Sequence, residues 1–206
     1  NFRDSGTGTN NQLIAVNGTV LYNLANGAWI SKRTGLTSGA KSRFTTFLDY
    51  VFHVNGSDTT NTWDGSSSSF GTTNASSAPI AKFADTFKSR VYLAANNTNP
   101  DRLWYSTVPD SSNLITWDTG ASGQWIDIAP QDGENLTGIK RFGRELLVYK
   151  ANNMYRYLGI AGTDPDPLIR VGTQSQESVI EAKDGVHFHH PGSNSIQRYS
   201  GGYPQE

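Results

Sequence analysis

Residues 99–106, with the sequence Asn-Pro-Asp-Arg-Leu-Trp-Tyr-Ser, are the stretch that decides the fold. A turn-forming start leads directly into a short aromatic run. The same alternation continues through residues 125–128, 145–150 and 154–157, where aromatic and β-branched runs are separated by clusters of Asn, Asp, Gly, Pro and Ser. Such a pattern is typical of antiparallel strands joined by tight turns. The stretch therefore predicts small antiparallel sheets.

Fainter copies of this plan occur on both sides of the stretch. We expect five units, at about residues 12–35, 42–70, 80–130, 136–160 and 178–206. Their central strands, aligned at Val20, Val51, Val91, Leu147 and Val186, lie roughly 30 to 55 residues apart. This spacing brackets that of propeller blades, and no amphipathic helix of useful length is visible. The sequence predicts one all-β domain, a propeller-like array of about five small antiparallel sheets that forms an incomplete or open propeller.

Several local expectations are specific enough to be tested. Residues 1–11 are polar and Gly-rich and predict a flexible lead-in, and residues 47–54 predict one continuous strand that ends at an Asn-Gly turn. Residues 66–77 are almost all small or polar and predict a surface loop that buries little. Residues 115–117 and 124–128 are expected to finish or extend the third sheet.

Composition excludes several classes of site. The 206 residues carry a formal net charge of −1, from 17 basic and 18 acidic side chains, so no basic excess points to phosphate binding as the main role. Cysteine is absent, which excludes disulfides, thiolate metal sites and a cysteine nucleophile. No apolar run approaches about 18 residues, so we expect no membrane insertion by a helix. The first residues show neither an initiator Met nor a signal-type segment, as expected for a sequence that starts inside a longer protein.

The motifs of residues 99–157 resemble a pattern found in tail and neck proteins of tailed bacteriophages. The pattern runs from Asn99-Pro100 through Arg102-Leu103-Trp104-Tyr105-Ser106 to Trp117, then through residues 125–128 and 132–138 to the strands at 145–150 and 154–157. Residues 185–188 and 196–202 are similar to the closing unit of the same group. The resemblance covers residues 82–206 well and the first 80 only through the repeat.

The resemblance implies a virion β-propeller module in the tail, portal adaptor or stabilisation apparatus. It implies other tail, neck or portal proteins as partners, a homo-oligomer, a virion location and assembly in the host cytoplasm. It transfers no catalytic residue, because its motifs are structural.

Three groups of residues could suggest a metal site. His187 and His189 share one face of a predicted strand, and His190 follows, but further ligands would have to come from elsewhere. We interpret them as part of a half-exposed strand whose inward face is Val186 and Phe188. The Asp-Pro-Asp-Pro run at 164–167 is interpreted as a rigid, solvated connector and residues 132–135 as a polar turn, since a hard cation needs six or more oxygen ligands.

Scattered carboxylates and two Trp-Asp dipeptides are the features that could indicate glycosidase chemistry. A glycosidase needs two carboxyl groups about 5–9 Å apart, and nothing in the sequence pairs the scattered Asp85, Asp101, Asp118, Asp127 and Glu145. The Trp-Asp dipeptides at 63–64 and 117–118 resemble the dipeptide of one propeller family, and residues 117–120 also resemble the Asp-box turn of sialidases. Because the companion motifs are missing, we interpret both tryptophans as packing between blades.

The fourth unit carries basic residues beside aromatic ones, a mixture that could touch DNA passing through a tail channel. These residues are Lys140, Arg141, Arg144, Lys150 and Arg156, beside Tyr149, Tyr155 and Tyr157. We favour the simpler explanation, that these residues are solvated strand ends.

We therefore expect a non-enzymatic structural component of a bacteriophage virion, with no catalytic, cofactor-binding or metal-binding residues and no cofactor. Two alternatives stay open. One is a carbohydrate-binding propeller that recognises a host-surface glycan through exposed Trp and Tyr residues, and the other is a glycoside hydrolase propeller.

Overall fold

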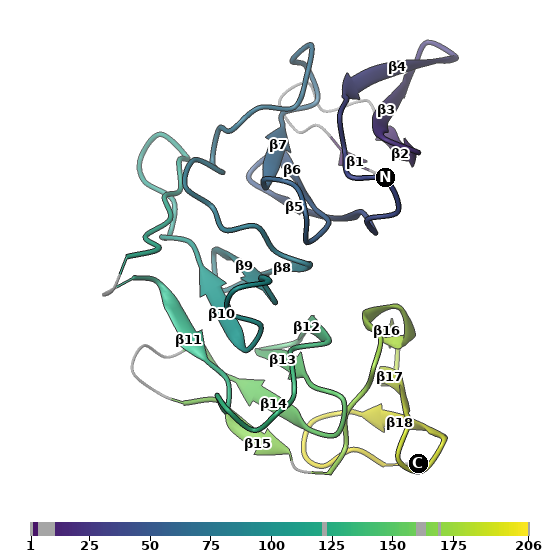
Figure 1. Ribbon diagram of the computed structural model, residues 1–206, viewed down its shortest axis with the longest axis vertical. Coiled ribbons are helices and arrows are strands. Elements are labelled where there is room, and N and C mark those ends of the chain that lie inside the picture. The colour runs from purple at the N-terminus through teal and green to yellow at the C-terminus, as the bar shows by residue number, and fades with distance from the viewer. Residues whose placement is uncertain (1, 4–10, 121–122, 160–163, 169, 206) are drawn as a thin grey trace.

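The computed structural model describes residues 2–3, 11–120, 123–159, 164–168 and 170–205. Within these residues the fold is all-β: five small antiparallel sheets follow one another along the chain, and none closes into a barrel (Figure 1). The prediction of an open, propeller-like array of five sheets is confirmed.

Each sheet is a simple meander of three or four strands. Sheet 1 holds β1 (Phe2–Arg3), β2 (Asn11–Asn17), β3 (Val20–Ala25) and β4 (Ala28–Arg33). Sheet 2 holds β5 (Arg43–Phe47), β6 (Tyr50–Val54) and β7 (Asn61–Trp63). Sheet 3 holds β8 (Phe83–Phe87), β9 (Arg90–Ala94), β10 (Arg102–Tyr105) and β11 (Trp125–Asp127). Sheet 4 holds β12 (Gly138–Phe142), β13 (Glu145–Tyr149), β14 (Met154–Tyr157) and β15 (Asp166–Leu168). Sheet 5 holds β16 (Ile180–Ala182), β17 (Gly185–His190) and β18 (Ser195–Tyr199), preceded by the 3-10 turn η1 (Gln176–Ser178).

The first strands of sheets 2, 3 and 4 line the inside of a curved array. β8 lies against β5 on one side and β12 on the other. The sheets follow an arc in Figure 1, with sheet 1 and sheet 5 at its two ends. We call the face of a sheet that is directed toward the following sheet its forward face, and the opposite one its rear face.

The core consists of four layers, one between each pair of consecutive sheets. Side-chain alternation along the central strands builds them, because successive residues of a strand point to opposite faces. In β9, Val91 and Leu93 pack toward sheet 2, whereas Tyr92 and Ala94 pack toward sheet 4. In β13, Leu146 and Val148 face sheet 3. A sheet of this size cannot bury an apolar face alone, so stacking of neighbours supplies the stability.

Two strands that the sequence did not reveal are formed by tight hairpins. β5 turns into β6 at Leu48 and Asp49, which have φ values of 48° and 62°, and β8 turns into β9 at Lys88 and Ser89, with 44° and 56°. The prediction of one continuous strand over residues 47–54 is therefore wrong. Two-residue hairpins need positive φ at both central positions, and here residues other than Asn-Gly adopt it.

Other local predictions also need correction. Phe2–Arg3 pairs with β2 instead of belonging wholly to a flexible lead-in, and the rest of that lead-in (residues 4–10) lies outside the described residues. Residues 115–117 form no strand, although β11 does complete sheet 3. The Ser/Thr-rich loop at 66–77 buries Phe70, Asn74 and Ala75. Because Asn74 accepts hydrogen bonds from Ile115 N and Trp117 Nε1, this loop is part of the packing between sheets 2 and 3.

Candidate functional site

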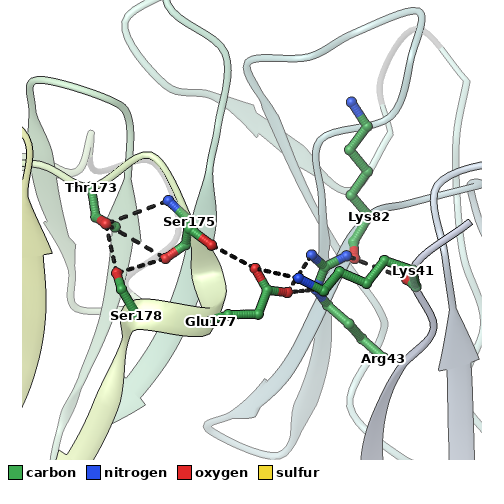
Figure 2. A network of polar contacts seen from close by, with 7 residues as sticks. All are labelled: Lys41, Arg43, Lys82, Thr173, Ser175, Glu177 and Ser178. Carbon is green, nitrogen blue, oxygen red and sulfur yellow. Dashed lines mark hydrogen bonds and ion pairs between the residues drawn. The ribbon is translucent and has the colours of Figure 1, made fainter.

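One polar network on the inner side of the array connects segments far apart in the sequence (Figure 2). Glu177 of η1 binds Arg43 of β5, with Oε1 2.6 Å from Nη2, and its Oε2 lies 3.1 Å from Lys41 Nζ. The contact joins residues that are 134 positions apart. We call Lys41, Arg43 and Glu177 the axis latch, because they connect sheet 2 with the segment leading into sheet 5.

The loop that carries the latch is itself held firmly. Ser175 Oγ donates to Glu177 Oε2 at 2.6 Å, and Ser178 Oγ lies 2.8 Å from Thr173 Oγ1. Gln176 Oε1 accepts a hydrogen bond from Ile139 N at 2.6 Å. This contact requires glycine at position 138, since a Cβ there would lie 2.5 Å from the same oxygen. η1 is therefore fixed to sheet 4 by contacts that do not involve the Glu177 carboxylate, which in turn binds sheet 2.

Charge compensation dominates the latch. Burial raises the pKa of Glu177, but hydrogen bonds from Ser175, Lys41 and Arg43 outweigh it and lower that pKa to about 2. The Arg43 guanidinium lies 4.7 Å from the centre of the Phe83 ring and donates to Lys82 O. The groove beside the latch has a volume of about 470 Å³. The Glu177 carboxylate is bound by two cations, Lys41 and Arg43. The site therefore suits a rigid connection between segments better than acid–base chemistry.

A second charged group lies between sheets 3 and 4. Lys150 is fully buried; its Nζ donates to Asp132 Oδ1 at 2.7 Å and to Ala129 O at 3.0 Å. Asp101 Oδ1 lies 3.2 Å from the same nitrogen, an ion pair without hydrogen-bond geometry. A buried cation is tolerated only when it is paired in this way. The expectation that Lys150 lies at a solvated strand end is therefore wrong, because its ammonium is internal and cannot contact DNA either.

The remaining basic residues of the fourth unit differ in their partners. Lys140 Nζ lies 2.9 Å from Glu181 Oε2, and Arg156 pairs with Asp166 at 2.9 Å and with Glu145 at 3.6 Å. Arg141 and Arg144 are exposed. Tyr149 is fully buried, and Tyr155 and Tyr157 are almost so. Two of these four basic side chains are thus paired with carboxylates, and the other two are exposed at the surface.

The scattered carboxylates each have their own structural role. Asp85 Oδ2 accepts from Arg141 N, and its burial raises its pKa. Asp127 forms a bidentate pair with Arg102, at 2.7 and 2.9 Å. Asp118 accepts from Gly120 N within its own turn, and Glu145 Oε2 accepts from Tyr199 Oη at 2.5 Å.

Asp101 and Asp127 do line one groove, with a volume of about 360 Å³, but each faces a cation. In the part of the chain that is described, this groove holds two compensated ion pairs instead of a free acid and a free base.

Arg102, in the stretch at residues 99–106, serves as a clamp. The Arg102 guanidinium lies 3.6 Å from the centre of the Trp125 ring and 5.1 Å from that of Trp104. Its two hydrogen bonds to Asp127 fix β10 against β11. The residues that carry the resemblance thus pack and clamp the third sheet.

The histidine strand has the alternation expected from the sequence. Val186, Phe188 and His190 are buried toward sheet 4, and His187 and His189 share the other, half-exposed face. His187 Nε2 lies 3.0 Å from Asp184 Oδ1, and His189 Nε2 lies 3.0 Å from Asn194 Oδ1. No group of three metal-ligating side chains occurs among the described residues.

Both acidic loops have structural partners. Asp166, Pro167 and Leu168 form β15, the outer strand of sheet 4, so the predicted solvated connector at 164–167 is partly wrong; proline is compatible with such an edge strand. In the turn at 132–135, Asp132 binds Lys150 and Glu134 accepts from Asn152 N at 3.3 Å.

The tryptophans of the two Trp-Asp dipeptides pack between sheets, as predicted. Trp63 lies in the layer between sheets 1 and 2, and Trp117 in the layer between sheets 2 and 3. Their indole nitrogens donate to Ser67 O and Asn74 O.

Sequence reasoning missed the latch and a second junction contact, between Arg33 and His53. Arg33 Nη1 donates to His53 Nδ1 at 2.9 Å, which leaves His53 Nε2 to donate to Ser42 Oγ. Burial and, next, the charge of Arg33 lower the pKa of His53 to about 4. No local motif marks either contact, because the partners come together only when the sheets stack.

Comparisons with known proteins identify a fold but no family. No family model matches the chain, and no curated protein matches it. The computationally designed Ika8 protein is similar over 94% of this chain and 56% of its own, with a TM-score of 0.54 and 10% identity. PorZ, a surface component of the type-IX secretion system of Porphyromonas gingivalis, matches over 94% of this chain and 32% of its own, with 15% identity and a TM-score of 0.39.

Both similarities are limited in what they support. At such identity the likeness to Ika8 concerns the fold alone, and the chain spans just over half of that protein's length. The PorZ score is too low to support an inference. A search for long apolar helices found none in the described ranges that could cross a membrane.

Proposed function

We propose that the chain is a non-enzymatic structural component of a bacteriophage virion, a β-propeller module of the tail or neck that joins or stabilises other virion proteins. The observation that carries this proposal is that the chain's distinctive charged and aromatic residues have structural roles. Arg102, Lys150, Glu177 and the buried tryptophans tie sheets or strands to one another. The residues that carry the resemblance to phage tail and neck proteins, such as Arg102 and Trp104, serve in packing and clamping, which fits a rigid connecting part.

The array also suits such a role mechanically. Sheets 2 to 5 are fixed by three core layers and by the axis latch, so that loops can be presented at constant positions. Polar loops such as residues 66–69 and 110–114 are mostly exposed at the surface. We propose that these loops contact neighbouring virion proteins.

Locating the protein in particles tests the proposal directly. Purified virions of the phage that encodes the chain would be examined by mass spectrometry, and the chain would be located in them by electron microscopy. We expect a fixed copy number at the tail or neck. Absence from purified particles, or a gene outside any virion gene cluster, would contradict the proposal.

A carbohydrate-binding role is a second candidate, favoured by one groove. This groove, of about 350 Å³, lies beside Trp104 and is bordered by hydroxyl and amide side chains: Ser77, Asn96, Thr98, Asn99 and Thr119. The buried Nε1 of Trp104 has no hydrogen-bond partner among the described residues. Because Trp104 is only 4% exposed, a sugar in this groove would be held mainly by the lining hydroxyls and amides, with the edge of the indole beside it.

Binding to a glycan array tests this candidate. The wild-type chain would be compared with Asn99→Ala, which removes a lining amide, and with Val108→Ala, which changes an exposed side chain that does not line the groove. Binding that is lost only in Asn99→Ala would support the candidate, and a blank array for the wild type would count against it.

A further inference from the structure

Two sheet faces at the ends of the array are not covered by any described part of the chain. The rear face of sheet 1 carries Leu13, Leu24 and Trp29 in one cross-strand row. They alternate with Ile14, Val16 and Leu21, which pack toward sheet 2. Leu13 is 44% exposed and Trp29 50% exposed. An apolar row of this kind has the character of the rear faces that are buried elsewhere in the array.

The forward face of sheet 5 is the other uncovered face. Ile180, His187 and Arg198 form one cross-strand row, and His189 pairs with Ile196 in the next. Ile180 is 61% exposed and Ile196 59%. This face therefore combines aliphatic side chains with His187 and Arg198, both of which lie within ion-pair distance of Asp184, at 3.0 and 3.5 Å.

The two faces are the two halves of a junction that the chain builds four times internally. In each internal junction, the forward face of one sheet packs on the rear face of the next. Among the described residues, no forward face of another sheet packs on the rear face of sheet 1. Likewise, no rear face of another sheet packs on the forward face of sheet 5. One head-to-tail contact between copies would cover four of the most exposed aliphatic and aromatic side chains together.

The chemistry of the two faces is also complementary. Arg198 on sheet 5 would meet a face that carries Trp29 and Tyr22. Arginine binds well over an indole ring, and the chain already uses that contact where Arg102 lies 3.6 Å from the centre of the Trp125 ring. Packing sheet 1 on a second sheet 1 would leave Ile180 and Ile196 exposed, so a two-fold contact explains less.

We propose that the forward face of sheet 5 in one copy binds the rear face of sheet 1 in a second copy, so that the array continues from chain to chain. Such a heterologous contact generates a ring or a helical assembly, depending on whether the rotation closes. The inference deepens the structural role proposed above and rests on it for its biological purpose. The contact itself is a property of the purified chain.

Complementation between two variants tests the contact. Trp29→Glu removes the sheet 1 half and Ile196→Glu the sheet 5 half. Each variant alone should associate at least about 30-fold more weakly than the wild type, as for an interface anchor. An equimolar mixture should form a complex of two chains and nothing larger, because only one intact half of each kind remains. Sedimentation equilibrium would measure the assembly sizes.

The controls separate folding from association. Val108→Glu places a charge at an equally exposed apolar site outside both faces and should assemble as the wild type does. Circular dichroism should be unchanged in all variants; if one is misfolded, Leu13→Glu or Ile180→Glu replaces it on the same face.

Two outcomes would overturn the contact. A wild type that stays monomeric at its highest soluble concentration removes it, and so does an Ile196→Glu variant that still forms dimers. If the two variants complement each other but the protein is absent from purified virions, the contact between copies is supported and the phage role is rejected.

Discussion

Sheet 1 and sheet 5 lie at opposite ends of the array, but they are attached in different ways. Sheet 5 packs on sheet 4 through a layer that includes Tyr149, Phe188 and Tyr199, and η1 in front of it reaches sheet 2 through the axis latch. In the part of the chain that the structure describes, sheet 1 packs on sheet 2 alone, through a smaller layer around Trp63 and Phe70. Polar contacts such as that between Arg33 and His53 surround this layer.

The difference indicates two levels of cooperativity. Sheets 2 to 5 are connected both along the chain and across the inner side of the array, so losing one junction affects the others. Sheet 1 has one junction and can separate while the rest stays folded, as expected when repeats interact only with neighbours. Four predictions test whether sheet 1 unfolds separately from sheets 2 to 5.

The largest expected effect comes from removing matched tryptophans in two junctions. Trp63→Ala and Trp117→Ala should each destabilise their own junction by about 3–5 kcal/mol. Hydrogen exchange should show that Trp63→Ala lowers protection in β2–β4 only, whereas Trp117→Ala lowers it across sheets 2 to 5. Equal loss across the whole chain in both variants would show that sheet 1 is not a separate unit.

The buried lysine is expected to matter nearly as much to the connected sheets. Lys150→Met leaves Asp101 and Asp132 without their cation and should lower the free energy of unfolding by about 3 kcal/mol. Lys140→Met, which breaks a partly exposed pair with Glu181, should cost below about 1 kcal/mol. Urea denaturation of both variants measures the difference, and similar costs would contradict a special role for Lys150.

Acid should loosen the junction of sheet 1 selectively. The pKa of His53 falls from 6.5 to about 4 on folding, so between these values the unfolded junction binds more protons. Its stabilisation is complete above pH 6.5, declines as the pH falls, and is about 2 kcal/mol smaller at pH 5. Hydrogen exchange in β2–β4, corrected for intrinsic rates, should show this decline in the wild type but not in His53→Gln.

The latch itself should have the smallest effect on stability. Its pairs are partly exposed, so Glu177→Gln should cost under about 1 kcal/mol at pH 7. Because folding lowers the pKa of Glu177 from 4.5 to about 2, the contribution of its charge is present above pH 4.5 and is lost as the pH falls to 2.

Stability curves of the wild type and Glu177→Gln should therefore converge between pH 4.5 and 2. Glu181→Gln is the control, since it lies outside the latch. A constant difference between the two curves down to pH 2 would mean that the charge of Glu177 does not hold η1 to sheet 2.

Much of the fold was visible in the sequence because strand signals are local. The runs at 90–94, 102–105 and 145–149 became strands as predicted, since aromatic and β-branched residues alternate there between turn formers. The first strands of sheets 2 and 3 escaped prediction because Leu48-Asp49 and Lys88-Ser89 lack the Asn-Gly signature of a two-residue turn.

The polar connections could not be predicted, because their partners are distant in sequence. Lys150 was expected at the surface, and only the stacking of sheets 3 and 4 places its ammonium beside Asp101 and Asp132. The contacts of Glu177 with Lys41 and Arg43 could not be predicted, since a single glutamate outside any motif gives no signal of its partners.

The sequence by itself determined that this protein is an all-β array of five small sheets with aromatic layers between them. Alternation along each strand sets which residues face a neighbour, and that depends on local order alone. Only the tertiary structure decided how the sheets are locked, through the axis latch, the buried Lys150 and the Arg33–His53 contact, and which two faces remain uncovered. Those features depend on the curvature of the whole array, to which every sheet contributes and which no single stretch of sequence encodes.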